Sequence, residues 1–138
     1  MKLELRGPKV PNVLLKALER ATDSAELMMS SVTFGEDSRI LRFKLRRLVS
    51  PRTFSLRSLL RPPRSPETVE CWLTVMGVED LRIHRCNHAM EDRCLIMFGV
   101  QASDTSVSVV SAEEHDGKPC FELVATFREL SICLEDLP

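Results

Sequence analysis

Polar and apolar residues alternate with a period of two along most of this chain, which is the pattern of half-buried β-strands. Residues 2–6 (KLELR) are a short first example, ended by Gly7 and Pro8. Two longer runs, residues 27–34 and 39–48, flank the tetrapeptide GEDS at 35–38. A loop of this length and composition between two such runs predicts a β-hairpin.

The second run of this hairpin separates two kinds of side chain. Because successive residues of a strand face opposite sides, Leu41, Phe43 and Leu45 are predicted on the core side. The residues between them are basic: Arg42, Lys44 and Arg46. One face of this strand is therefore expected to be apolar and the other positively charged.

The second half of the chain is also predicted as strands. Gly77 marks a turn between an alternating run at 69–75 and the next strand, which contains Leu81 and Ile83. A polar loop at 87–92 precedes a run in which one apolar face is predicted to hold Cys94, Ile96, Phe98 and Val100. Residues 105–112 and 120–127 form a predicted hairpin around Asp116-Gly117, with Phe121, Leu123, Ala125 and Phe127 inward. A last strand directs Leu130, Ile132 and Leu134 inward.

One helix is expected, at residues 11–22. Pro11 suits a first helical turn, and Leu14, Leu15, Leu18 and Ala21 recur at helical spacing. No second helical pattern lies between the strands, so the crossovers that parallel strands need are missing. The prediction is an α+β fold: a mostly antiparallel sheet of about eight or nine strands, which could curl into a sandwich or half-barrel, with one N-terminal helix.

The chain length of 138 residues favours one domain spanning 1–138. Its longest interruption is a proline- and arginine-rich segment at 49–66, which contains Pro51, Pro62, Pro63 and Pro66. Proline removes an amide donor that a central strand needs, so this segment is predicted to be a loop.

Targeting signals and cysteines bear on the compartment. The first residues lack the continuous apolar stretch of a secretory signal, and no window approaches the roughly 20 apolar residues of a membrane-spanning helix. The five cysteines are an odd number without a Cys-x-x-Cys pair. A soluble, cytoplasmic protein with free thiols and no membrane contact is the expectation.

The formal charge of −1 conceals an uneven distribution. Residues 39–64 contain nine basic and no acidic residues, whereas residues 65–138 contain five basic and fourteen acidic ones. The local charges are therefore +9 and −9, with −1 left for residues 1–38. The total argues against a polycationic nucleic-acid binder, but the distribution favours one directional contact or internal pairing.

The basic segment supplies a candidate contact surface, composed of Arg42, Lys44, Arg46, Arg47, Arg57, Arg61 and Arg64. Guanidinium groups could bind phosphates through bidentate hydrogen bonds. Against this, only Phe43 and Phe54 interleave with the basic residues, whereas single-strand binders usually supply several stacking rings. In the alternative interpretation, the outward basic side chains pair across strands with carboxylates such as Glu70 or Glu122.

Chemical sites are only weakly indicated. His84, Cys86 and His88 are a candidate zinc set, but the predicted strand ends near Cys86 and the spacing is not that of a zinc motif. Cys71 and Cys94 are expected on apolar faces, where a thiol behaves as a small hydrophobe. No catalytic residue and no cofactor are predicted, since no phosphate-binding glycine loop or complete catalytic set occurs.

Trp72 is predicted on the polar side of its strand, where an outward tryptophan indicates an interface or a covering helix such as 11–22. The favoured function is a non-enzymatic protein-interaction module, immunity- or antitoxin-like or self-associating, whose partner is another protein or a second copy. The alternative is a nucleic-acid or phosphate-ligand binder that uses residues 39–64.

Overall fold

A computed structural model describes residues 1–49, 67–85 and 94–138 of the chain. In these ranges it contains 13 strands, every pairing of which is antiparallel, and one α-helix. The expected mostly antiparallel α+β fold is confirmed. The expected single sheet of eight or nine strands is too simple, because the strands form three sheets and no closed barrel.

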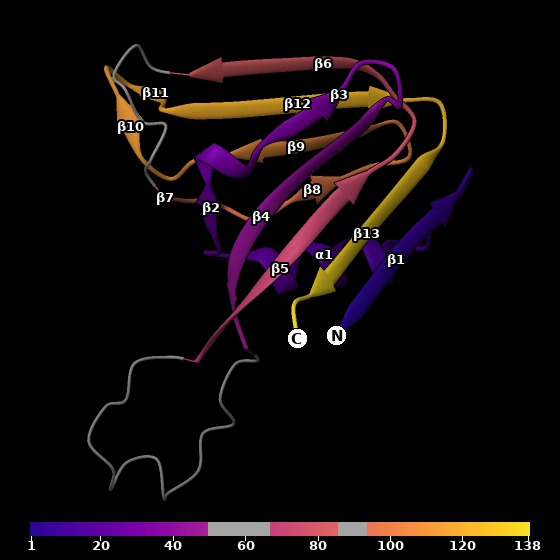
Figure 1. Ribbon diagram of the computed structural model, residues 1–138, viewed down its shortest axis with the longest axis horizontal. Helices are drawn as coiled ribbons and strands as arrows, with labels where there is room; N and C mark the ends of the chain where they lie inside the picture. Colours follow the sequence, from indigo (N-terminus) through magenta and orange to yellow (C-terminus); the bar gives the residue numbers. More distant parts are fainter. Residues whose placement is uncertain (50–66, 86–93) are drawn as a thin grey trace, which may run out of the picture.

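The strands are arranged in one large sheet, one smaller sheet and a short ribbon (Figure 1). The seven-stranded sheet has the order β1 (Lys2–Gly7), β13 (Leu130–Asp136), β5 (Thr68–Val75), β4 (Ile40–Leu48), β2 (Glu26–Met28) and β7 (Cys94–Ile96), with β3 (Thr33–Gly35) also paired to β4. The four-stranded sheet has the order β6 (Val78–Arg85), β12 (Phe121–Phe127), β9 (Ser106–Val110) and β8 (Gln101–Ala102). The ribbon pairs β10 (Glu114–His115) with β11 (Lys118–Pro119).

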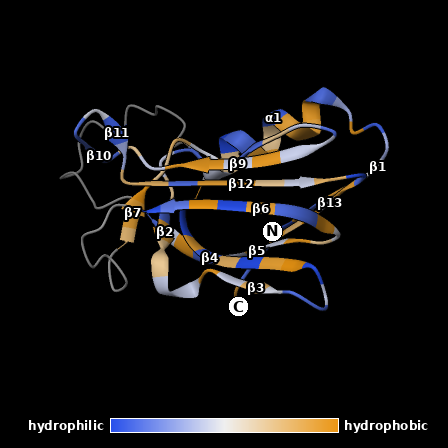
Figure 2. Cartoon of the chain, turned by 90° about the horizontal axis from the view of Figure 1, so that it is seen from above, coloured by the Kyte–Doolittle hydropathy of each residue, from blue (hydrophilic) through white to orange (hydrophobic). Residues whose placement is uncertain are grey.

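The two larger sheets pack face to face, with a shared apolar core between them (Figure 2). Alternate residues of β4 and β5 on one side, and of β12 on the other, are buried as their alternation predicts. The core side chains include Leu41, Phe43, Leu45, Leu73, Phe121, Leu123, Ala125 and Phe127. Buried residues from before and after segment 50–66 therefore contribute to one core.

The helix α1 (Asn12–Thr22) follows Pro11, as expected, and packs against β1, β4 and β8. It lies on the same side of the seven-stranded sheet as the four-stranded sheet (Figure 2). Leu18 and Thr22 are its buried residues. Thr22 Oγ1 donates a hydrogen bond to the Leu18 carbonyl at 2.8 Å and accepts one from the Val100 amide at 2.7 Å, which fixes the end of the helix to the chain before β8.

A short 3-10 helix, Met29–Ser31, interrupts what the sequence pattern predicts as one strand at 27–34. The interruption separates β2 from β3, although both pair with β4. Ser31 Oγ accepts a hydrogen bond from the Lys44 amide at 2.8 Å, and so bonds the part of β4 that faces the interruption. Met29 is thereby directed into the core.

Arg39 joins the turn between β3 and β4 to the start of β6. Its φ of 57° is in the left-handed region, and its carbonyl accepts a hydrogen bond from the Val78 amide at 3.0 Å. Its Nε donates to the Val78 carbonyl at 2.8 Å, and its Nη2 donates to the Glu79 carbonyl. Arg39 is therefore a structural connection between the two sheets.

The expected tight turn at Asp116-Gly117 is present. Both residues have positive φ, 53° and 76°, and they connect β10 to β11 inside the longer β9–β12 hairpin. Two positive φ angles in succession are typical of the hairpin turn that Asp-Gly favours.

The expected inward face of residues 94–100 is wrong at three of its four positions. Leu95 and Met97 are buried with Val100, whereas Cys94, Ile96 and Phe98 are exposed. The physical reason is that the sequence CLIMFGV is apolar in both phases, so alternation cannot select a face. Met97 pairs with Ser111, which lies just after β9. Residues 94–100 therefore connect the two sheets.

The predicted loop at 49–66 and the polar loop at 87–92 lie outside the described residues, apart from Val49. In the described part of the chain, α1 is the only α-helix, and with 11 residues it is too short to cross a membrane.

Candidate functional site

The side chains of β4 are divided between two faces, as the alternation predicts. Phe43 and Leu45 are fully buried, while Arg42, Lys44 and Arg46 point to the outer side of the seven-stranded sheet. This outer side faces away from the four-stranded sheet and from α1 (Figure 2).

We call the outer surface formed by β2, β4 and β5 the Trp72 face. It is composed of Glu26, Arg42, Lys44, Arg46, Glu70 and Trp72. Each of these six side chains is exposed or only half-buried.

Trp72 lies at the centre of this face, opposite Lys44 in the β4–β5 register. The guanidinium carbon of Arg42 is 4.0 Å from the centre of the indole ring, and Lys44 Nζ is 5.9 Å from it. Both cations are within the range in which the ring quadrupole attracts a positive charge. Thus Arg42, and not the helix 11–22, covers the indole, and the suggested covering role of the helix is not observed.

Two carboxylates form ion pairs with the other two cations of the Trp72 face, Lys44 and Arg46. Glu70 is 2.9 Å from Lys44 Nζ and 3.6 Å from Arg46 Nη2, and Glu26 is 3.5 Å from Arg46 Nη1. The hydrogen bond from Lys44, assisted by Arg46, lowers the pKa of Glu70 below its ordinary value. The cross-strand pairing that the sequence offered as an alternative is therefore present with Glu70.

The charge that remains on the Trp72 face belongs to Arg42. Three cations are set against two carboxylates, and within the described residues Arg42 has no carboxylate at ion-pair distance. Its guanidinium stacks on an aromatic ring and keeps its hydrogen-bonding edge available. The face can thus offer a rigid aromatic surface with one uncompensated guanidinium.

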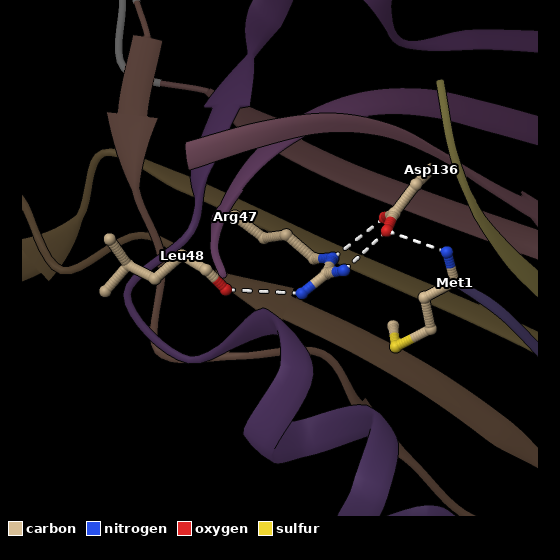
Figure 3. A network of polar contacts seen from close by, with 4 residues as sticks. All are labelled: Met1, Arg47, Leu48 and Asp136. Atoms are coloured by element: carbon tan, nitrogen blue, oxygen red, sulfur yellow. Dashed lines mark hydrogen bonds and ion pairs between the residues drawn. The ribbon is translucent and has the colours of Figure 1, made fainter. Parts of the chain in front are cut away.

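Arg47 does not belong to this outer surface. It shares the inner side of β4 with Leu45, and only 7% of it is exposed. Its guanidinium binds Asp136 through Nε–Oδ1 at 2.9 Å and Nη2–Oδ2 at 2.6 Å, and donates from Nη1 to the Leu48 carbonyl at 3.2 Å (Figure 3). The Met1 ammonium is 3.1 Å from the same carboxylate. The Arg47 hydrogen bonds lower the pKa of Asp136.

The remaining residues of the predicted contact surface, Arg57, Arg61 and Arg64, lie outside the described residues. Of the basic residues that are described in this segment, Arg39 bonds backbone carbonyls and Arg47 bonds Asp136. The three outward residues Arg42, Lys44 and Arg46 therefore represent the predicted surface in the structure.

The candidate metal residues are not brought together by anything that the structure describes. His84 lies on β6 with an exposed side chain, on the outer side of the four-stranded sheet opposite Glu122. Cys86 and His88 are outside the described residues. Elsewhere in the described ranges, no group of three His, Cys, Asp or Glu side chains is close enough to hold a metal ion.

The two thiols predicted on apolar faces have different environments. Cys71 is fully buried, and burial raises its pKa to about 11 even though Arg47 acts in the opposite direction. Cys94 is exposed on β7. The expectation of a buried thiol is thus correct for Cys71 and wrong for Cys94.

Two features of the site escaped sequence reasoning. The stacking of Arg42 on Trp72 depends on the β4–β5 register, which the sequence of either strand alone does not specify. Glu26 lies beside Arg46 because β2 pairs with β4, and the sequence pattern placed the start of that strand at Leu27. The outward position of Trp72 was available from alternation.

No protein-family model, curated protein or solved structure matches this chain.

Proposed function

We propose that this chain is a non-enzymatic protein-interaction module and that the Trp72 face is its contact surface. The observation that carries the proposal is Trp72 itself, an outward indole with Arg42 and Lys44 at 4.0 and 5.9 Å from its ring centre. It lies on a sheet face that points away from the helix and the second sheet. Tryptophan and arginine are the residues most enriched among those that dominate binding energy in protein interfaces.

The ion pairs of the face support a rigid surface. Lys44 and Arg46 are long side chains whose freedom would have to be lost on binding, and their contacts with Glu70 and Glu26 already restrict it. A surface that is ordered before association loses less entropy when a partner binds. This arrangement is expected of a surface that meets one preferred partner.

The partner that fits is a folded protein with an apolar patch beside a carboxylate. The part of the indole that Arg42 leaves exposed would pack against the apolar patch, and the edge of the stacked Arg42 guanidinium, which has no carboxylate partner among the described residues, would bind the carboxylate. By covering such a patch the chain would act in the manner of an immunity protein or antitoxin.

The alternative function, binding of nucleic acid or a phosphate ligand, has weaker support. Glu70 and Glu26 already neutralise much of the charge of Lys44 and Arg46. Nucleic-acid affinity depends on cations that release counterions from phosphates. Within the described residues, Arg42 is the one cation of the face without a carboxylate partner, and Trp72 is the one ring.

A reducing compartment is part of the proposal. Cys71, Cys94 and Cys133 are free thiols, which disulfide-forming compartments usually do not leave unpaired. We propose the cytoplasm as the place of action.

The test compares binding by variants of the immobilised chain. Trp72→Ala and Arg42→Glu should each abolish retention of a protein that the wild type retains from cell extract. The control Arg82→Glu reverses the charge of an exposed residue on the outer side of the other sheet and should bind like wild type. With the retained protein purified, Trp72→Ala should weaken the affinity by about 2 kcal/mol, roughly 30-fold.

Two results would contradict the proposal. Equal binding by the wild type and both variants would exclude the Trp72 face. Retention of single-stranded DNA that is lost in Arg42→Glu and falls steeply with salt would favour the alternative function instead.

A further inference from the structure

The strand β1 forms the margin of the seven-stranded sheet, with β13 as its neighbour on one side (Figure 1). In the part of the chain that the structure describes, no element pairs with its other side. Such an edge presents unpaired backbone donors and acceptors to an incoming strand.

The backbone direction of β1 shows which groups face this open edge. The Asp136 amide donates to the Met1 carbonyl at 3.0 Å, so Met1 and Asp136 form a hydrogen-bonded pair. In antiparallel sheets hydrogen-bonded and non-bonded pairs alternate. Leu3 and Leu5 therefore direct their backbone groups to β13, and the backbone groups of the three residues between and beside them point outward: Lys2, Glu4 and Arg6.

The side chains of these same three residues are exposed and alternate in charge. Glu4 is 3.4 Å from Lys2 Nζ and 3.9 Å from Arg6 Nη2 within the strand. Natural sheet edges are often protected from pairing with another chain by charged side chains, especially lysine. An alternating series differs because a second, antiparallel copy can be placed so that opposite charges face each other.

Two registers bring opposite charges together when a second copy of β1 runs antiparallel to the first. With the twofold axis at Leu3, Lys2 of each copy faces Glu4 of the other. With the axis at Leu5, Glu4 of each copy faces Arg6 of the other. Opposite charges that face each other across strands stabilise a sheet, so two registers are favourable.

The other edges of the sheets are less suited to pairing. The strand β8 has only two residues, and the start of β6 is occupied by Arg39, which bonds the Val78 and Glu79 carbonyls. The segment that continues β7 is paired with Ser111 through Met97. Beyond Glu79, β6 leaves an edge of the same length as β1, Asp80 to Arg85, that is unpaired within the described residues. Its outer side chains include one opposite pair of charges, Asp80 and Arg82, whereas β1 carries three alternating charges.

We propose that two copies of the chain associate through antiparallel pairing of their β1 edges. The seven-stranded sheet then continues from one copy into the other about a twofold axis perpendicular to it. Facing residues of antiparallel strands point to the same side, so both Trp72 faces lie on one side of the dimer. The pairing does not depend on the proposed function of that face.

The test is sedimentation equilibrium of wild type and Glu4→Pro over roughly a hundredfold range of concentration. The Glu4 amide points away from β13, so proline at this position removes no hydrogen bond between β1 and β13 but removes one to an incoming strand. Wild type should pass from monomer to dimer as concentration rises, and Glu4→Pro should associate at least about tenfold more weakly. Trp72→Ala should dimerise like wild type.

A charge series keeps the test decisive if proline disturbs the strand. Glu4→Lys makes the edge uniformly basic and should suppress dimerisation. The triple variant Lys2→Glu, Glu4→Lys and Arg6→Glu restores an alternating series and should dimerise again. A monomeric wild type at every concentration, or dimerisation of Glu4→Pro or Glu4→Lys equal to that of wild type, would overturn the proposal.

Discussion

The Arg47 guanidinium reaches across β5 and binds both oxygens of the Asp136 carboxylate, at 2.9 and 2.6 Å. The two residues come from β4 and β13, which are not neighbours in the sheet but lie on either side of β5. This ion pair is a polar contact at one end of the inner, otherwise apolar face of the seven-stranded sheet.

Arg47→Met should destabilise the protein by about 3 kcal/mol. Removal of Arg47, which is 7% exposed, leaves the Asp136 carboxylate with the Met1 ammonium as its remaining cation among the described residues and without its two hydrogen bonds from the guanidinium. Urea denaturation followed by Trp72 fluorescence measures the change. The matched control is Arg46→Met, one residue earlier on the exposed face, where loss of surface ion pairs should cost less than about 1 kcal/mol. Equal losses in the two variants would contradict the burial of Arg47.

The Asp136 carboxylate should make stability depend on pH in the acid range. Its pKa in the folded protein is below the ordinary value of 3.8, because Arg47 bonds the ionised form. The stabilisation is present in full above the unfolded pKa and is lost as pH falls toward the folded pKa. Urea midpoints between pH 7 and pH 2.5 should therefore fall more steeply for wild type than for Asp136→Asn. An identical acid dependence in Asp136→Asn would argue against this assignment.

Alkylation should distinguish Cys94 from Cys71. Cys94 is exposed, whereas Cys71 is buried and has its pKa raised to about 11, so it has little thiolate near pH 8. Iodoacetamide labelling with peptide mass spectrometry should modify Cys94 in the folded protein and Cys71 only in denaturant. Labelling of Cys71 at the rate of Cys94 without denaturant would contradict the structure.

Thr22→Val should lower stability by about 1 to 3 kcal/mol, although valine has nearly the same shape. The buried hydroxyl donates to the Leu18 carbonyl and accepts from the Val100 amide, and valine leaves that amide without its partner. Thr22→Ser keeps the hydroxyl and is the control, expected to lose less stability than valine in urea denaturation. A larger loss for serine than for valine would show that the methyl group, not the hydrogen bond, matters.

Alternation of polar and apolar residues predicted the fold well where one face is clearly apolar. In β4 the order Leu41, Phe43 and Leu45 matches the buried positions. In residues 94–100 the same rule selected the wrong face at three positions, because nearly every residue there is apolar. The two-residue strands β8, β10 and β11 are too short to produce any period, which accounts for part of the low strand count.

The candidate site was predictable in part. Alternation placed Arg42, Lys44, Arg46 and Trp72 on outer faces, but their contacts depend on strand register. Arg47 has the same parity as Leu45, so alternation itself indicated an inward side chain. The predicted contact surface nevertheless included Arg47 with the other basic residues of the segment, and arginine is rarely buried without a partner. That partner, Asp136, is 89 residues away in the sequence.

The neighbouring positions of β1 and β13 also determine how the chain must fold. The first strand pairs with the last, from Lys2 opposite Glu135 to Gly7 opposite Leu130. Closing so long a segment of chain costs entropy before any contact can repay it, and such non-local pairing slows folding. During synthesis β1 must therefore remain unpaired with its final neighbour until residues 130–136 have left the ribosome.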